Sequence, residues 1–479
     1  MSMYWIDTPP IYLTVGRWRI ANLLRWERLC LLLFLCMLIV PVVLRLTLHV
    51  YPFDPFLVGL YLFWAIRSYH LKKCPQEQMK AAVWRLAPTE FGLLLFIHWL
   101  FLSTIVAVNP INSLIYWLLI LRGALIYIYI RKNLGTTFGI NELWNTFTVL
   151  LVIECAVGIL QFATNSRIGS LNDYFGDVEV YANSVFYTSL GPVMRVVGTF
   201  HNPNILANWV ILLGPLTYVS LYFNAAKGMR IRYPLLILSC LTILLTFSRS
   251  GWLCFAFGAL VTSAHVLKQN AQLAAYLVVH LMKAVIFIFM PLALIGIFIL
   301  LRYTDFNLMA IIERFSDLSA GGTWRMGYVN LSWQLIQHYP LFGVGLGNFG
   351  EAIILNGNLI NFPSSLVNSA ILSTVHNLYM QFLAEAGIGA GFLWLAVTSG
   401  LLVKVWRLNN LTRRHFPKLH IVALWLNAAI FGYLFNTNFE ALFFHEDVFM
   451  VFCILLGVLF ATDSYCRRHS TLYQPAVKN

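Results

Sequence analysis

Long apolar runs recur along most of this 479-residue chain. Many approach the roughly 20 residues that a helix needs to cross the hydrocarbon of a bilayer. Only helices and closed barrels can span a membrane, and these runs are continuous rather than alternating, so they predict helices. The composition agrees, because 59% hydrophobic and 11% charged residues would leave a water-soluble globule short of polar surface. We therefore expect an all-α, polytopic integral membrane protein.

The apolar runs predict about twelve transmembrane helices in a single membrane domain over residues 1–479. The expected spans are 29–48, 54–67, 91–107, 113–130, 146–163, 204–223, 234–247, 250–267, 281–301, 386–403, 420–436 and 447–462. No early stretch joins a short apolar core to a small-residue cleavage site, so we expect the amino terminus to stay uncleaved.

The basic residues predict the orientation of these spans, because lysine and arginine accumulate in cytoplasmic loops. With the amino terminus inside, most of the 32 lysines and arginines fall in cytoplasmic segments, and both termini are cytoplasmic. Basic loops beside an anionic leaflet then account for the net charge of +13 without a nucleic-acid partner. The arginines left on the outer side are Arg167, Arg195, Arg249, Arg302, Arg314 and Arg325.

Two long connections are expected on the outer side, at residues 164–203 and 302–385. Loops of this length in a compact fold tend to be functional or disordered. Apolar residues at helical spacing over 323–338 predict an amphipathic helix in the membrane interface. A glycine-rich turn at 342–348 follows Pro340, and without a βαβ context its GxGxG pattern does not indicate a nucleotide site.

Three outer arginines lie in local contexts that suggest a function. Arg195 precedes Asn202 and Pro203, residues typical of a helix start; Arg249 lies in a tight turn between two spans. Arg325 lies in the expected interfacial helix. Guanidinium groups stay charged and bind phosphate oxygens with two parallel hydrogen bonds, so a diphosphate would use several of them.

Each of these arginines also has a simpler explanation that involves no substrate, because arginines near an interface extend toward lipid headgroups. We assign Arg167, Arg302 and Arg314 to that class. Arg122 lies within a span and is expected to face the bundle interior and pair with an acidic residue, for which Glu154 is the candidate.

His376 ends the second long loop and, with Asn377, enters a helix. A histidine titrates near neutrality and accepts a proton from a hydroxyl, although a packed or capping role is the common one. His201 is a second choice, and Glu440 belongs to an outward acidic cluster that would bind sugar hydroxyls or solvate a loop. Neither long loop contains any of the eight cysteines, so no disulfide framework or metal site is expected.

Four elements together resemble a known family: 198–207, 246–252, the helix with Trp324 and Arg325 that runs into 340–345, and the helix that begins at His376 and Asn377. In this order they resemble the O-antigen ligase and O-antigen polymerase superfamily over residues 195–460. Ligases of the superfamily carry His, then Asn, Ser or Gln, nine residues, Gly, two residues, and Gly, Thr or Tyr. Here Gly387 fits the pattern and position 390 is alanine, which leaves ligase and polymerase both open.

The resemblance implies a GT-C-like fold and a metal-independent, inverting glycosyltransferase of the bacterial inner membrane, without cofactor. It would move a glycan from an undecaprenyl-diphosphate donor to a periplasmic hydroxyl, on a growing glycan or a lipid A-core-like acceptor, in lipopolysaccharide or other surface polysaccharide synthesis. Arg195, Arg249 and Arg325 would bind the donor diphosphate, and His376 would assist the acceptor hydroxyl. Further candidates for substrate binding are Asn377, Asn202, His201 and Glu440.

Two other classes of function stay open at this point. A membrane transporter of a small anion or sugar would need charged residues deep in the spans, where Arg122 and Glu154 are almost the only ones. A scaffold would need no reactive site. The glycosyltransferase hypothesis instead expects the three arginines and His376 to converge at one outward cavity.

Overall fold

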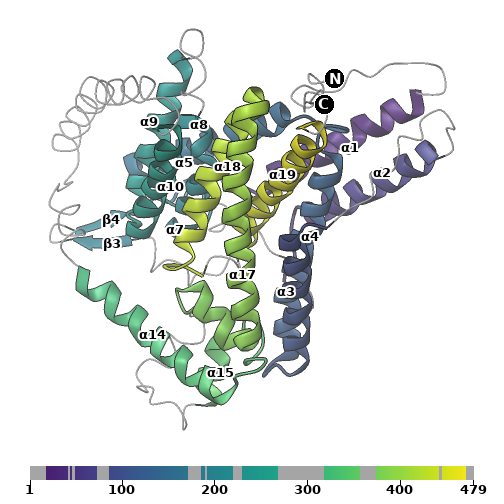
Figure 1. The fold of residues 1–479 in the computed structure, drawn as a ribbon. Coiled ribbons are helices and arrows are strands. Elements are labelled where there is room, and N and C mark those ends of the chain that lie inside the picture. The colour runs from purple at the N-terminus through teal and green to yellow at the C-terminus, as the bar shows by residue number, and fades with distance from the viewer. Residues whose placement is uncertain are drawn as a thin grey trace, which may run out of the picture. The chain divides into compact units, whose positions relative to one another are not determined.

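The computed structural model describes residues 18–40, 44–45, 49–72, 86–170, 185–188, 191–219, 229–267, 318–356, 374–441 and 445–470. Most of these residues are helical (Figure 1). The chain forms two compact units. Unit 1 comprises Met1–Leu150, Leu331–Ala423 and Ala441–Asn479, and unit 2 comprises Leu151–Asn330 and Leu424–Glu440.

Unit 1 is built from paired helices. α3 packs along α17, α4 along α19, and α1 along α2, and Figure 1 shows α17 as a long helix beside α3. The bounds are α1 Trp18–Met37, α2 Asp54–Lys72, α3 Pro88–Ile105, α4 Pro110–Asn133, α15 Phe349–Leu355, α17 Leu378–His415 and α19 Glu446–Ser470. A short antiparallel pair, β1 Leu44–Arg45 and β2 His49–Val50, precedes α2.

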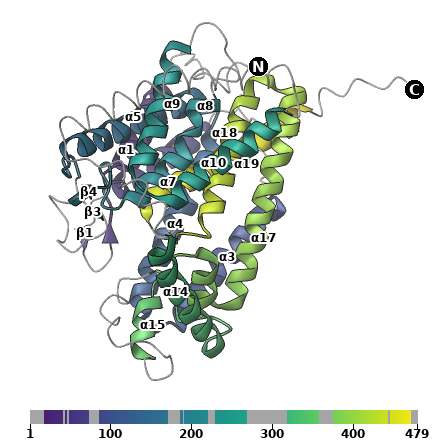
Figure 2. The same cartoon turned by 90° about the vertical axis from the view of Figure 1, so that its left-hand side faces the viewer.

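Unit 2 holds a group of shorter helices around α7. α7 contacts α8, α9 and α10, and the hairpin of β3 and β4 is labelled at the left of Figure 2. The bounds are β3 Val185–Thr188, β4 Gly191–Met194, α7 Pro203–Leu213, α8 Pro215–Val219, α9 Met229–Leu245 and α10 Arg249–Leu267. Three helices continue from one unit into the other: α5 Ile140–Thr164, α14 Leu318–His338 and α18 Pro417–Asn436.

Several helices begin where the sequence supplies a cap. Asn202 accepts a hydrogen bond from the Asn204 amide at 2.8 Å, and Pro203 is the first residue of α7. This helix start was predicted from the sequence and is confirmed. Asn109 with Pro110 begins α4 in the same way. A side-chain acceptor and a proline both suit a helix start, because the first amides lack acceptors within the helix.

Six helices in the described part of the chain are long and apolar enough to cross a membrane: α3, α4, α5, α17, α18 and α19. The expected span 281–301 lies outside the described residues. The bounds 29–48 were wrong, because α1 covers Trp18–Met37. The expected span 204–223 is divided at Gly214, where Pro215 lacks an amide hydrogen to continue α7. The total of about twelve spans stays a prediction.

Arg122 does not pair with Glu154, as the sequence had suggested. Its Nε lies 2.9 Å from Oδ1 of Asp54 at the start of α2, and its guanidinium lies 5.1 Å from the centre of the Tyr51 ring. Glu154 instead accepts a hydrogen bond from the Thr199 amide. The expectation failed because it considered only charged residues deep in the spans as partners for Arg122. Asp54 lies at the end of its helix.

The expected amphipathic helix at 323–338 is present as α14, which begins earlier, at Leu318. Leu335 is fully buried, whereas Met326 and Trp333 are 68% and 54% exposed. This division between two faces suits a helix that lies in an interface. Its location in the membrane surface stays a prediction.

A buried ion pair joins three helices of unit 1. The Arg67 guanidinium on α2 donates to Glu27 on α1 at 2.8 Å and to Asn133 on α4 at 2.6 Å. Tyr129 donates its hydroxyl to the same carboxylate at 2.9 Å. Glu27 is fully buried, so its charge depends on these partners.

Arg67→Ala should therefore lower the free energy of unfolding by about 3 kcal/mol or more, because the Glu27 carboxylate stays buried without its cation. Thermal unfolding of the purified protein in detergent measures this change. Arg414→Ala, at an exposed position in the last turn of α17, serves as the control. Equal shifts for the two variants would contradict a role of this ion pair in stability.

Candidate functional site

In unit 2, polar side chains of α5 hold the segment that leads from Arg195 to α7. Oε1 of Gln161 accepts hydrogen bonds from the amides of Val197 and Gly198, at 2.9 and 3.0 Å. Glu154 accepts from the amide and the hydroxyl of Thr199, at 3.0 and 2.7 Å. The segment is not helical, so its amides need such acceptors once they are buried.

Glycine is required within this segment. Gly198 has φ +65°, and a Cβ atom at this position would lie 2.1 Å from Oε2 of Glu154. A side chain would thus meet both backbone strain and the carboxylate that holds the segment. The close approach lets Glu154 reach the Thr199 amide.

Arg195 and Arg325 belong to one hydrogen-bond network in unit 2. Arg195 donates to the carbonyl oxygen of Thr246 at 3.0 Å and to the side chain of Asn204 at 3.3 Å. Asn204 donates to Oε1 of Glu440 at 3.0 Å, and Arg325 donates to the same oxygen at 2.6 Å. The network therefore joins four segments that are far apart in the sequence, and two of them reach the Glu440 carboxylate, through Asn204 and Arg325.

A second set of contacts holds Glu440 at this place. Asn436 on α18 donates to the side chain of Asn208 on α7 at 2.7 Å, and Asn208 donates to the carbonyl oxygen of Asn204 at 2.9 Å. The amide of Glu440 donates to the carbonyl oxygen of Asn436 at 3.0 Å. These buried amide contacts fix the end of α18 beside the start of α7.

The network is buried at its carboxylate and open at one arginine. Glu440 is 3% exposed, whereas the Arg325 side chain is 40% exposed. A guanidinium carries five N–H donors, and the contact with Glu440 uses one of them, on Nη2. The exposed part of Arg325 can therefore bind an anion while Glu440 holds the side chain in place.

Arg249 begins α10, three positions after Thr246, whose carbonyl oxygen accepts from Arg195. Gly251 lies in the first turn of α10, where a Cβ atom would lie 2.8 Å from Cβ of Ala207 on α7. The turn and the start of α10 thus pack closely against α7. The amino-terminal end of a helix adds partial positive charge at the arginine.

His201 and Asn202 occupy the connection just before α7. Burial, with the nearby charge of Arg167, lowers the pKa of the His201 imidazole from 6.5 to about 4. His201 is therefore neutral near pH 7 and adds no charge for an anion. The Asn202 side chain accepts from the Asn204 amide as the cap of α7, which is a structural role.

His376 and Asn377 belong to unit 1. Asn377 caps α17 by accepting from the Met380 amide at 3.0 Å. His376 has φ +53°, a left-handed conformation that is uncommon for residues other than glycine. The amide of Val375 donates to the Gln381 side chain at 2.8 Å. This contact holds the segment that carries His376 against the first turn of α17.

Glu385 connects this segment to the glycine-rich turn. Its carboxylate accepts from Gln381 at 2.6 Å and from the amides of Gly347 and Phe349 at 2.9 and 3.2 Å. Its carbonyl oxygen accepts from the Gly345 amide at 2.7 Å. The GxGxG pattern therefore serves to pack backbone against α17, and the prediction that it is a turn holds.

A kink in α17 makes this packing close. Gly387 has φ 79° and ψ 179°, and a Cβ atom there would lie 2.0 Å from the carbonyl oxygen of Leu341. Gly343 approaches the backbone of Glu385 in the same way. The glycine of the sequence motif after His376 thus has a packing reason.

The structure joins Arg195, Arg325 and Glu440 through contacts in unit 2, and Arg249 lies three positions after Thr246, whose carbonyl oxygen accepts from Arg195. His376 lies in unit 1, so its convergence with the arginines stays a prediction.

Sequence reasoning missed Gln381 and Glu385. The signal was present, because polar and ionised residues in an apolar helix usually have a specific partner. Among the described residues no cluster of three or more His, Cys, Asp or Glu side chains could hold a metal ion.

Comparison with protein families gives a match. Residues 234–395 match the family model described as O-antigen ligase. The matched stretch contains Arg249, Arg325, the glycine-rich turn and His376, whereas Arg195 and Glu440 lie outside it. No curated protein matches the chain significantly. The match supports the superfamily that the sequence resembles.

Glu385→Ala should loosen the glycine-rich turn, because three buried donors lose their acceptor at once; a loss of about 3 kcal/mol in unfolding free energy is expected. Hydrogen exchange of the amides of Gly347 and Phe349 measures the local effect. Glu351→Ala removes a partly buried carboxylate from α15 and is the control, with little change expected in those two amides. Unaltered exchange in Glu385→Ala would disprove the role of this carboxylate.

Proposed function

We propose that this chain, whose residues 234–395 match the O-antigen ligase family model, transfers a glycan from an undecaprenyl-diphosphate donor to an acceptor hydroxyl. The family match supports a membrane glycosyltransferase-like function in polysaccharide biosynthesis. The finer proposal places the protein in the bacterial inner membrane with both termini in the cytoplasm and the reaction on the periplasmic side. It takes a growing glycan or a lipid A-core-like molecule as acceptor.

The observation that carries the proposal is the contact of Arg195 and Arg325 with one network around Glu440. Two guanidinium groups from distant segments are held in place by a buried carboxylate and an asparagine. Such groups match the oxygens of a diphosphate and keep their charge at every physiological pH. We assign Arg249, at the start of α10, to the same diphosphate.

In the proposed reaction the acceptor oxygen attacks the anomeric carbon from the side opposite the diphosphate, which inverts the configuration. The bond from this carbon to the diphosphate oxygen breaks, and the electron pair leaves with the diphosphate. His376 takes the proton of the acceptor hydroxyl. The arginines stabilise the charge that develops on the leaving group, so the proposed reaction needs no metal ion.

Glu440 has a positioning role in this proposal. Its charge holds Arg325 beside Asn204 before the donor binds, which lowers the cost of ordering a long side chain. Asn202 and His201 lie at the start of α7 next to this group, and Asn377 follows the proposed base. We propose these residues as secondary contacts for the glycan.

Substitution of the arginines tests the site. Arg325→Ala and Arg195→Ala should each lower the rate of undecaprenyl-diphosphate release by about a hundredfold, because each removes one contact to the leaving group. Arg325→Lys keeps the charge without the planar fork and should fall between the wild type and Arg325→Ala. The assay uses purified protein in vesicles with a lipid-linked glycan donor and an acceptor.

Arg413→Ala, an exposed position in the last turn of α17, is the matched control and should keep full activity. His376→Ala should lower the rate without weakening donor binding, since the histidine acts on the acceptor. Unaltered rates in the variants at Arg195, Arg325 and His376 would contradict the proposed site. Measurable flux of an anion or sugar across the vesicles, without donor consumption, would instead favour a transporter.

Deletion of the gene tests the acceptor class. A ligase attaches a finished polymer, so its loss should leave envelope lipid without attached polymer. A polymerase extends the glycan, so its loss should leave acceptors that carry one repeat unit. Gel analysis of envelope glycans distinguishes these results, and an unchanged glycan profile would contradict both.

A further inference from the structure

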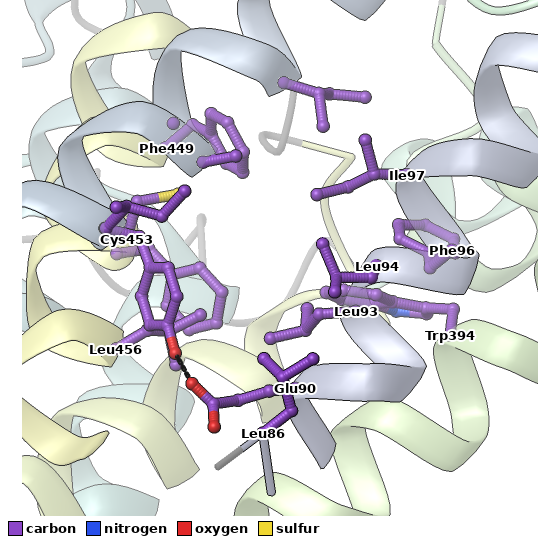
Figure 3. Close-up of a pocket in the computed structure, with 16 residues that line it drawn as sticks. Leu86, Glu90, Leu93, Leu94, Phe96, Ile97, Trp394, Phe449, Cys453 and Leu456 are labelled. Carbon is purple, nitrogen blue, oxygen red and sulfur yellow. Dashed lines mark hydrogen bonds between the residues drawn. The ribbon is translucent and has the colours of Figure 1, made fainter. Parts of the chain in front are cut away.

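An apolar groove lies within unit 1, and none of the residues proposed for glycan transfer lines it. It runs between the α3–α17 pair and the α4–α19 pair and has a volume of about 430 Å³. In Figure 3, Leu94 and Ile97 of α3 face Phe449 and Cys453 of α19 across open space. A space of this size suits a ligand, since packed interiors leave few gaps larger than a water molecule.

The groove opens sideways along α3. Leu86 and Leu94, which line it, are 45% and 49% exposed. α3 and α4 are both long and apolar enough to cross a membrane, so this opening faces hydrocarbon in the membrane-embedded protein. An apolar chain in the bilayer can enter it without crossing a polar barrier.

One end of the groove is closed by a carboxylate that already has its partners. Glu90 accepts from the Tyr127 hydroxyl, pairs with Arg131 and also accepts from the Ala87 amide at 2.8 Å. The dashed line in Figure 3 marks the contact with the tyrosine. The rest of the wall is almost entirely apolar, with Trp394 and Cys453 in it, so the groove suits an alkyl chain rather than a sugar.

Cations gather beside this closed end. Arg131 and Lys132 lie in the last turn of α4, Arg468 lies in the last turn of α19, and the charges of Arg131, Arg468 and Glu90 all act on Lys132. The side chains of Lys132 and Arg468 are exposed. Cations at helix carboxyl ends are common without any ligand, so the cluster alone identifies no site. The position of the cluster at the end of an apolar groove is the observation that points to a ligand.

We propose that this groove binds an anionic phospholipid of the cytoplasmic leaflet, with one acyl chain between the two helix pairs and its phosphate beside Lys132 and Arg468. In such a lipid the phosphate lies near the ester end of the acyl chain. The groove has the same order, with the cations and Glu90 at one end and the apolar walls beyond them. The expected orientation puts these helix ends in the cytoplasm. A donor whose diphosphate is bound on the outer side would have its phosphates in the other leaflet.

Lipid binding to the purified full chain tests the proposal. Native mass spectrometry in detergent, after incubation with phosphatidylglycerol or phosphatidylcholine, should show preferential retention of phosphatidylglycerol. Lys132→Gln combined with Arg468→Gln should lower its occupancy by roughly fivefold for each cation removed. The control pair Arg413→Gln and Arg414→Gln removes equal charge from the last turn of α17 and should leave occupancy unchanged.

Filling the groove provides a test that does not depend on charge. Ala124 lines the groove, and Ala124→Phe should remove the bound lipid while thermal unfolding shows that the protein stays folded. Leu94→Trp at the opening is a second variant with the same expected result. Equal retention of both lipids, equal loss in the control pair, or unaltered lipid in both filling variants would overturn the proposal. Displacement of phosphatidylglycerol by undecaprenyl phosphate would also overturn it, since the groove would then hold a polyprenyl chain.

Discussion

Backbone that leaves the helix inside a membrane protein must find hydrogen-bond partners, because hydrocarbon supplies none. Both units meet this requirement in the same way. Glu154 on α5 holds the segment that follows Arg195, and Glu385 on α17 holds the glycine-rich turn and, through Gln381, the segment that carries His376. Arg195 and His376, two residues of the proposed site, thus lie at the ends of irregular segments that buried side chains hold in place. Loss of either carboxylate would release the segment before it altered any helix.

The sequence predicted the helices well where apolar residues dominate. It failed at α1, whose first half carries charged residues that hydropathy counts as polar. Glu27 there is buried because Arg67 and Tyr129 reach it from other helices. A hydropathy profile treats each residue alone and cannot contain such a pair. The partner of Arg122 was missed for the same reason, since Asp54 lies outside the apolar core of its helix.

The candidate site was partly accessible from sequence because outward arginines depart from the usual distribution of charge. That argument selected Arg195, Arg249 and Arg325 individually. It could not show that Asn204 and Glu440, 236 positions apart, join two of them. Nor could it show that the glycine-rich turn packs on the helix that follows His376, since both contacts depend on tertiary folding. Motifs identified the parts, and packing decides which of them share a network.

The ion pair of Glu440 with Arg325 has a kinetic consequence. Bare arginines would hold a diphosphate tightly both before and after the sugar leaves it, and slow product release limits many enzymes. In the proposed reaction, a carboxylate that already neutralises part of the charge of Arg325 weakens the attraction between the diphosphate and the remaining donors of the guanidinium. It weakens binding of donor and product alike while it stays in contact with the arginine. Under the proposed function, Glu440 thereby shortens the residence time of the lipid diphosphate, which favours repeated turnover over tight binding.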